Sequence, residues 1–331
     1  MTQNKEKIIF SGAQPTGSLT LGNYIGAIQS WKELEDDFKC YYSIVDLHSL
    51  TIRHDPKEFK KYCLSFLAQY LACGLDPEKN TLFFQSHVAQ HAELNWILSC
   101  NTYMGELNRM IQFKEKSQKH SDNVNAGLFT YPVLMVADIL LYQADLVPVG
   151  EDQRQHIELT RDIATRFNNT YGETFTLPDI HMPKIGARIM SLQEPESKMS
   201  KSDDNINGTI FLLDSDKDII KKMKRAVTDS ENKVIYCDEQ PGVKNLMTIY
   251  SKLTNDTIKE IEGKYDSKGY GAFKTDLAEI VVESLRPFKE KYEEYMENPD
   301  YLANIYKKGA QRATEAAEKT MEVVRDRIGL V

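Results

Sequence analysis

Strand-like and helix-like segments alternate through the first half of the chain, and this alternation constrains the fold more than any other feature. Short apolar runs predict strands at residues 7–11, 39–45, 81–85 and 146–149, and helical apolar spacing occurs at 24–34, 57–72, from 92 onwards and at 152–166. Strands that alternate with helices form a parallel sheet with helices on both faces. Ligands of such sheets bind beyond the carboxyl ends of the strands. Gly12, Asp46, Gln85 and Gly150 fall at these ends and could line one crevice.

The second half of the chain has a different pattern. Strand signals fade after about residue 207, and from residue 216 the spacing is mostly helical, with interruptions at Gly242, 269–271 and Pro299. We therefore expect an α/β protein with two domains. Residues 1–206 are predicted to form a Rossmann-type, parallel-sheet nucleotide-binding domain that includes a mobile loop at 197–203, and residues 207–331 a smaller all-helical C-terminal domain.

Composition excludes several classes of protein. Of the 331 residues, 41% are hydrophobic and 27% are charged, which is typical of a globular chain and not of a disordered one. No apolar run reaches the ~18 residues of a transmembrane helix, and the short N-terminus of mixed charge does not resemble a signal or transit peptide. The five cysteines are odd in number and form no C-x-x-C pair, so we expect reduced thiols in a cytoplasmic protein and no metal site.

The first candidate site is the loop GAQPTGSLTLGN at residues 12–23, directly after the first predicted strand. A loop between a strand and a helix N-terminus binds anions, because free backbone N–H groups and the helix dipole point the same way. Gly22 would let a flat base approach the backbone closely. Thr20 and Asn23 share one face of a first helical turn, from which both can reach a phosphate. Glycine-rich loops are weak signals, so a plain strand-to-helix turn is the alternative.

The second candidate site is the polar loop ESKMSKSD at residues 196–203. Lys198 and Lys201 lie three positions apart among hydroxyl groups, and each places a positive charge on a long flexible stem. Such a loop suits a phosphate chain whose charge shifts during a reaction, and the neighbouring Pro195 and Ser197 indicate a loop that can move. The alternative is a solvated surface loop, because charged residues mostly lie on the surface.

These two loops resemble the signature motifs of the class I aminoacyl-tRNA synthetases. The string K-M-S-K-S is whole at residues 198–202, whereas T-L-G-N at residues 20–23 stands where most class I enzymes carry H-I-G-H. That departure, with Q-P-T-G ahead of it at residues 14–17, is typical of the tryptophanyl branch. Two further blocks, ADILLY at residues 137–142 and GEDQRQHIELTRD at residues 150–162, agree and stand in the right order. The chain resembles the bacterial-type tryptophanyl-tRNA synthetases over its full length.

The resemblance implies an enzyme that activates L-tryptophan with ATP and passes it to the 3′ end of tRNA(Trp). The attacking carboxylate is already ionised, so the protein mainly holds it in line and stabilises charge on the leaving pyrophosphate. By resemblance Lys198 and Lys201 carry out this second task, helped by Mg²⁺ on the phosphates, and Thr20 and Asn23 complete the catalytic set. The expected ATP site comprises Gln14, Pro15, Thr16, Gly22, Asn23, Gly150, Glu151, Asp152, Ile189, Lys198, Met199, Ser200, Lys201 and Ser202.

Asp138 carries the argument for the substrate. It is an acid within the otherwise apolar run 131–142, and a buried carboxylate needs a hydrogen-bond donor. The indole N–H of tryptophan is a donor only, and by resemblance this position binds it. The alternative is a structural aspartate that pairs with an arginine or caps a helix. The expected tryptophan site comprises Asp138, Phe10, Gly12, Met135, Tyr131, Val147, Val149, Gln153 and, as a residue that only lines the pocket, His48.

A tRNA partner has to be reconciled with a net charge of −8, which argues against general nucleic-acid binding. Contact must then be confined to local basic patches, although such runs are also typical of solvated helix faces. By resemblance we also expect a homodimer and no membrane partner. The two candidate patches are Lys217, Lys221, Lys222, Lys224 and Arg225, and Lys114, Lys116 and Lys119.

Three other functions stay open on the sequence. A tyrosyl enzyme of the same subclass would offer groups for a phenol O–H and usually carries K-F-G-K-S in its mobile loop. A smaller adenylyltransferase would share the first loop but lack the helical C-terminal region. A duplicated synthetase kept as an RNA-binding or regulatory protein could have lost Lys198, Lys201 or Asp138, and all three are intact. At single positions, Glu151 and Asp152 could equally be acids that complement the dipole of the following helix.

Overall fold

The sheet has five parallel strands in the order β3-β2-β1-β4-β5 in the computed structural model, which describes residues 6–28, 34–119, 124–181, 188–201 and 205–331. The strands are β1 (Ile8–Ala13), β2 (Lys39–Ile44), β3 (Thr81–Phe84), β4 (Leu146–Pro148) and β5 (Asp179–His181). The parallel α/β fold and its four predicted strands are confirmed, and β5 is an additional strand. Because β1 pairs with both β2 and β4, the chain changes direction across the sheet between β1 and β4. Ligands bind at such switch points.

Alternate residues of the strands point into two separate cores. Ile9 and Tyr42 pack on one face against α4 (Pro56–Ala72). Phe10 and Tyr41 pack on the other face against α5 (Gln90–Ser99), α8 (Ala126–Leu140) and α9 (Arg154–Tyr171). This division follows from the two-residue period of a strand. Shorter helices complete this part of the molecule, namely α1 (Leu21–Asn23), α3 (Asp46–Ser49), α6 (Met104–Asn108) and α7 (Ile111–Lys119).

Two predicted helices begin differently in the structure. The helix predicted at 24–34 starts earlier, at α1, and continues as a π-helical turn over 24–28; residues 29–33 lie outside the described residues. Its start is fixed by Thr20, which accepts from the Asn23 backbone N–H at 3.1 Å while the Asn23 side chain accepts from the Thr20 N–H at 3.1 Å. The helix predicted at 152–166 opens with a 3₁₀ turn at 151–153 and runs as α9 to Tyr171, where Gly172 adopts φ 97°.

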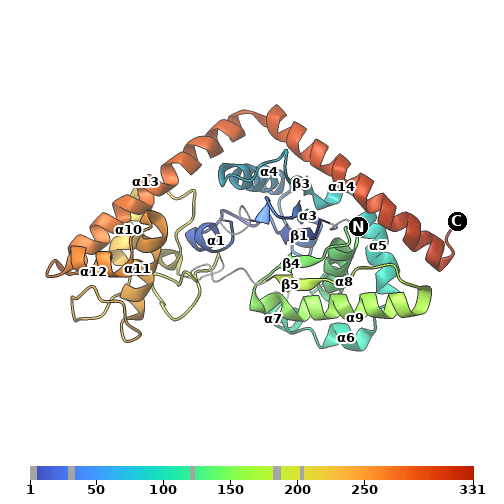
Figure 1. The fold of residues 1–331 in the computed structure, drawn as a ribbon, viewed down its shortest axis with the longest axis horizontal. Helices are drawn as coiled ribbons and strands as arrows, with labels where there is room; N and C mark the ends of the chain where they lie inside the picture. Colours follow the sequence, from blue (N-terminus) through green and yellow to red (C-terminus); the bar gives the residue numbers. More distant parts are fainter. Residues whose placement is uncertain (1–5, 29–33, 120–123, 182–187, 202–204) are drawn as a thin grey trace, which may run out of the picture.

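Helices dominate the chain after residue 207, as predicted. They are α10 (Asp216–Arg225), α11 (Pro241–Thr254), α12 (Ile258–Tyr265), α13 (Gly269–Glu297) and α14 (Pro299–Ile328). Gly242, Gly269 and Pro299 lie in the first turns of helices rather than between them, because a first turn needs few intrahelical N–H bonds. Figure 1 shows α13 and α14 as a long bent arch that reaches from α10–α12 to the sheet. None of the described helices is long and apolar enough to cross a membrane.

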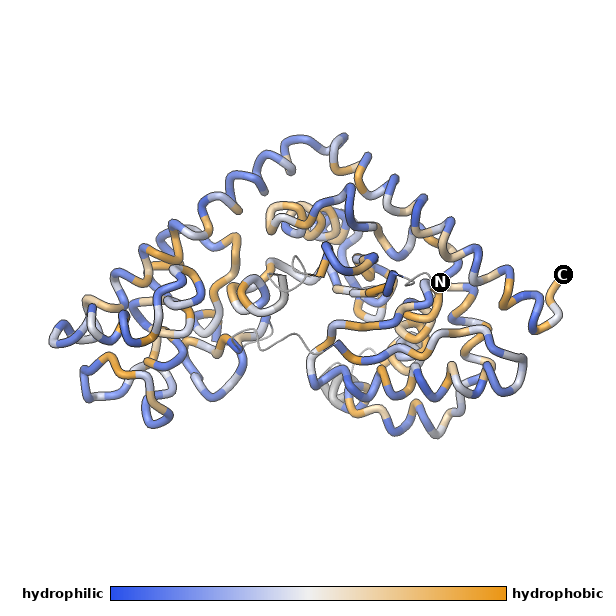
Figure 2. Tube along the Cα trace, in the orientation of Figure 1, coloured by the Kyte–Doolittle hydropathy of each residue, from blue (hydrophilic) through white to orange (hydrophobic). Residues whose placement is uncertain are grey.

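The last helix packs directly against the sheet. A Cβ atom at Gly309 would lie 1.8 Å from the Leu82 carbonyl oxygen, so only glycine permits this approach of α14 to β3. Ala310, Ala313 and Ala317 of α14 are buried in the same core as Phe83. The outer edge of the arch is largely hydrophilic, whereas α4 below it is largely hydrophobic (Figure 2). Part of the predicted C-terminal domain therefore shares a core with the sheet, and the boundary at residue 206 stays a prediction.

Candidate active site

A cavity of about 450 Å³ opens at the switch point between β1 and β4. This volume lies in the range of small-molecule sites. Residues from β1, the loop after it, α3, α8, β4 and the second polar loop line it together. The predicted site residues among them are Phe10, Gly12, Gln14, Thr16, Asn23, His48, Tyr131, Met135, Asp138, Val147, Val149, Gly150, Gln153 and Lys201. The predicted ATP and tryptophan sites thus meet in one cavity.

Several predicted ATP-site residues do not line this cavity, and their roles stay predictions. Thr20 is buried and caps α1. Glu151 is exposed and pairs with Arg154 at 2.5 Å. Met199 is buried in the core. The complete set is Pro15, Thr20, Gly22, Glu151, Asp152, Ile189, Lys198, Met199 and Ser200, while Ser202 lies outside the described residues.

The second polar loop forms the return arm of a hairpin. The Ser191 N–H donates to the Ser197 carbonyl at 2.8 Å, and the Met199 N–H donates to the Ile189 carbonyl at 3.0 Å. A Cβ at Gly22 would lie 3.5 Å from the Cβ atoms of both Ile189 and Met199, so the first loop packs closely on this hairpin. The Gly22 position therefore serves the contact between the two signature loops, in addition to any contact with a base.

A third segment, residues 209–212, ties both loops together. The Leu21 N–H donates to the Ile210 carbonyl at 2.9 Å, and the Leu212 N–H donates to the Leu19 carbonyl at 2.8 Å. The Thr209 hydroxyl donates to the carbonyl of Ser200 in the second loop at 2.8 Å. Two main-chain bonds and one side-chain bond therefore link the two signature loops through this segment.

Lys201 and Lys198 have different environments. Lys201 donates from Nζ to the Thr16 carbonyl at 3.1 Å, and its ammonium lies 4.9 Å from the centre of the Phe66 ring. Burial lowers the pKa of Lys201 to about 8. Lys198 is exposed and does not line the cavity. Of the two lysines of this loop, only Lys201 therefore lines the cavity.

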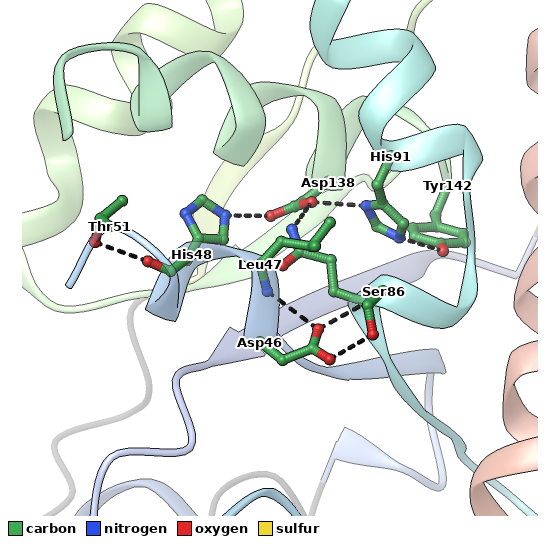
Figure 3. Close-up of polar contacts among 9 residues, drawn as sticks. Asp46, Leu47, His48, Thr51, Ser86, His91, Asp138 and Tyr142 are labelled. Carbon is green, nitrogen blue, oxygen red and sulfur yellow. Dashed lines mark hydrogen bonds and ion pairs between the residues drawn. The ribbon is translucent and has the colours of Figure 1, made fainter. Parts of the chain in front are cut away.

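Asp138 is buried, with 1% of its surface exposed, and accepts three hydrogen bonds (Figure 3). Its Oδ2 lies 2.7 Å from His48 Nε2, and its Oδ1 lies 2.6 Å from both His91 Nδ1 and Gln85 Nε2. Burial raises the pKa of Asp138, but the interactions with His48 and His91 outweigh it and lower the pKa to about 2. The carboxyl is therefore ionised and acts only as an acceptor. Among the described residues no arginine pairs with it, and its partners are instead two histidines and a glutamine.

Sequence reasoning missed the deeper partners of Asp138. Gln85 and Asp46 were both predicted to line the crevice, but neither lines the cavity. Gln85 donates to Asp138, and Asp46 accepts from the Ser86 N–H at 2.9 Å. His91 carried no sequence signal, since its place depends on how α5 packs against α8. Other lining residues that were not predicted are Ser11, Ala13, Leu19, Val45, Phe66, Tyr70, Gln112, Ile139 and Pro148.

One member of the first basic patch is not on the surface, so that part of the prediction is wrong. Lys222 is 6% exposed and donates to Asp214 Oδ2 at 2.6 Å and to the Thr209 carbonyl at 2.8 Å. It therefore supports the 209–212 segment from inside. The other members of this patch are exposed, namely Lys217, Lys221, Lys224 and Arg225, as is Lys114 of the second patch.

No group of three or more histidine, cysteine or acidic side chains that could hold a metal ion occurs in the described ranges. Asp138 is the only carboxylate among the described lining residues of the cavity, and it is already held by histidines.

Comparisons with known proteins agree with this geometry. A family model described as tRNA synthetases class I (W and Y) matches residues 2–286. The tryptophan–tRNA ligase of Clostridium tetani is 54% identical over 329 residues, which is 99% of this chain and 97% of the relative. The crystal structure of tryptophanyl-tRNA synthetase from Mycoplasma pneumoniae has a TM-score of 0.88 at 36% identity, with 98% of both chains covered. The Campylobacter jejuni enzyme, complexed with ADP and tryptophan, has a TM-score of 0.86 at 37% identity, covering 98% of this chain and 100% of the other. This chain is a member of the class I tRNA synthetase family of the tryptophan and tyrosine enzymes.

Proposed function

We propose that this protein is a tryptophan–tRNA ligase, which forms tryptophanyl-adenylate and pyrophosphate from L-tryptophan and ATP and then esterifies the 3′ end of tRNA(Trp). The observation that carries the proposal is the ionised carboxylate of Asp138 in the wall of the cavity that Lys201 also enters. An acceptor-only group suits the donor-only indole N–H. The tryptophan–tRNA ligases at 54% identity support the same substrate.

The tryptophan site is formed by apolar side chains around that carboxylate. Phe10 lies on β1, Val147 lies on β4, and Val149 directly follows β4. Met135 and Tyr131 lie on α8, one and two turns before Asp138. These surfaces fit the faces of an indole ring, and the buried acceptor fixes its orientation. A phenol O–H both donates and accepts, so a tyrosyl enzyme would need a further donor that the Asp138 carboxylate does not supply.

The ATP site lies toward the two signature loops. Gln14, Thr16, Asn23 and Gly150 line the cavity there, and Lys201 supplies a positive charge. Lys201 stabilises the negative charge that develops on the leaving pyrophosphate. Mg²⁺ bound to the ATP phosphates would neutralise part of the same charge. The Campylobacter jejuni enzyme is complexed with ADP and tryptophan in its crystal structure, which supports the pairing of a nucleotide with this amino acid.

The experiment that tests this function is ATP–pyrophosphate exchange, run separately with each of the protein amino acids. We expect exchange with tryptophan and little with tyrosine or phenylalanine. Exchange with tyrosine in preference would establish the tyrosyl alternative. Absence of exchange with every amino acid in a folded, ATP-binding preparation would favour the RNA-binding paralogue.

The remaining partners are parts of the same proposal. The helical C-terminal domain binds the anticodon region of the tRNA, with exposed basic residues of α10 in contact with it, while the 3′ end enters the cavity. The reaction takes place in the cytoplasm. A second copy of the chain covers an apolar surface formed by Trp96, Tyr103, Met104 and Ile111, whose side chains are between 58% and 71% exposed. They lie on or beside α5, α6 and α7, which all pack on α8. Large exposed apolar side chains on helices that share a packing partner are consistent with such an interface.

A further inference from the structure

Asp138 presents its two oxygen atoms to different surroundings. The donors on Oδ1 are His91 and Gln85, and neither lines the cavity. The donor on Oδ2 is His48, which does line it. Because a carboxylate oxygen can accept two hydrogen bonds, Oδ1 is fully occupied from behind. Oδ2 accepts from His48 alone in the part of the chain that the structure describes, so it keeps one position for a ligand.

His91 is held in place by a second bond. Its side chain is fully buried, and Nε2 lies 2.8 Å from the hydroxyl of Tyr142. The ionised Asp138 can only accept, so His91 Nδ1 donates its proton to Oδ1, and Nε2 of the same ring is paired with the Tyr142 hydroxyl (Figure 3). Burial raises the pKa of Tyr142 well above its usual value, so the hydroxyl keeps its proton.

Tyr142 is itself fixed by two rings of the sheet. Its ring stacks on Phe10 with centroids 5.5 Å apart and on Tyr41 with centroids 4.6 Å apart. Phe10 also lines the cavity. The chain of hydrogen bonds from Tyr142 through His91 therefore begins at a ring that is stacked on the sheet and ends at the carboxylate of Asp138.

We propose that His91, oriented by Tyr142, is a positioning residue for substrate selection, which holds Oδ1 of Asp138 so that Oδ2 faces the cavity as an acceptor for an indole N–H. This inference rests on the proposed binding of the indole by Asp138. Without the Nδ1–H donor, the carboxylate can rotate or take up a proton, and either change removes the acceptor from the place where the N–H would lie. Selection of the N–H would then weaken while the apolar walls still bind the ring.

The test compares four variants in exchange reactions with L-tryptophan and with β-(3-benzothienyl)alanine, in which sulfur replaces the indole N–H. His91→Leu removes the donor. His91→Asn restores an N–H near the position of Nδ1. Tyr142→Phe removes only the hydroxyl that orients His91, and Tyr41→Phe is the matched control, because it removes a hydroxyl from the same stacked cluster without touching the hydrogen-bonded chain.

His91→Leu should lower kcat/KM for tryptophan about 10- to 100-fold, as expected when a hydrogen bond to a charged group is lost. The loss should lie in KM for tryptophan, with KM for ATP unchanged, and the sulfur analogue should be affected much less. His91→Asn should recover most of the preference for tryptophan, Tyr142→Phe should lose part of it, and Tyr41→Phe should keep it. A folded His91→Leu enzyme that keeps the wild-type preference, or loses both substrates equally, would overturn the inference.

Two further outcomes separate this inference from the proposed function. If a folded Asp138→Ala variant, which has no acceptor at this position, keeps the wild-type preference, the indole contact itself is wrong. If Asp138→Ala loses the preference while His91→Leu keeps it, only the role of His91 is wrong. Should His91→Leu not fold, as judged by circular dichroism, the comparison of Tyr142→Phe with Tyr41→Phe decides, and equal preferences in these two variants count against the inference.

Discussion

Lys201 and Thr16 join the two signature loops through a hydrogen bond of 3.1 Å between the lysine ammonium and the threonine carbonyl. The main chain of the first loop therefore holds the lysine at the cavity. Its ammonium also faces the ring of Phe66 at 4.9 Å, which compensates only part of the lost hydration. The lowered pKa of Lys201 is the consequence, and it makes the charge of this site depend on pH just above neutrality.

The first prediction follows from that pKa. Below pH 8 the free protein already carries the ammonium charge at Lys201, so ATP affinity should change little with pH. A bound phosphate raises the pKa of Lys201 again, so above pH 8 the binding of ATP takes up a proton. The affinity for ATP therefore falls as the pH rises, by at most about tenfold per pH unit. Isothermal titration with a non-hydrolysable ATP analogue between pH 7.5 and about 9.5 measures this slope. Lys201→Arg stays charged and should flatten it; an unchanged slope in that variant would assign the pH dependence to another group.

The second prediction concerns Asp138. Asp138→Ala should raise KM for tryptophan and reduce discrimination against phenylalanine, because a site that hydrogen-bonds a substrate group rejects analogues without it by up to ~10⁴–10⁵. The substitution also leaves His48, His91 and Gln85 without their acceptor, so the folded fraction has to be confirmed by circular dichroism. A folded variant with wild-type selectivity would show that the carboxylate is only structural.

The third prediction separates the two lysines of the second loop. Replacing either Lys198 or Lys201 with Ala should lower kcat for exchange by about 10²–10³ while Kd for tryptophan hardly changes, because both act on the transition state. In the ligand-free protein only Lys201 of this pair reaches the cavity. Lys201→Ala should therefore also weaken ATP binding, whereas Lys198→Ala should not. A loss confined to tryptophan binding would contradict both assignments.

The sequence predicted the sheet well because β1 to β4 are apolar runs whose side chains fill the two cores. It did not predict β5, whose three residues lie at the edge of the sheet and are only partly buried. Single-residue roles were harder to predict where a side chain has two possible partners. The Thr20 hydroxyl caps α1, a role that its spacing did not indicate, and its phosphate contact stays a prediction. Lys222 belonged to a charged run but pairs with Asp214 inside the protein. Only tertiary packing decides such cases.

The fourth prediction concerns the apolar surface on α5 and α6. Trp96 is 71% exposed in the isolated chain, and a second copy would bury it. Trp96→Glu would place a charge in that interface without a partner, so it should shift the protein towards monomer in sedimentation experiments. Tyr62→Glu on α4, which also replaces a partly exposed aromatic residue, is the matched control. A Trp96→Glu variant with the same sedimentation behaviour as this control would place the dimer contact elsewhere.

The fifth prediction concerns tRNA. Lys221 and Lys224 are exposed on α10, whereas Lys222 between them is buried and must be left intact because it holds the segment that joins the signature loops. The double variant Lys221→Glu and Lys224→Glu should weaken tRNA charging and flatten its salt dependence, since fewer counterions are released on binding. Tryptophan-dependent exchange without tRNA should stay at the wild-type level.

The negative charge added by the two substitutions could by itself weaken tRNA binding, because the chain already has a net charge of −8 and tRNA is a polyanion. The same double change at Lys57 and Lys60, exposed residues of α4, provides a control with the same net charge. If the α10 and α4 variants lose charging equally, the effect is a general repulsion between two polyanions and not a contact. If the α10 variant charges tRNA at the wild-type rate across a salt series, the patch lies elsewhere, and Lys114 of α7 is the next residue to change.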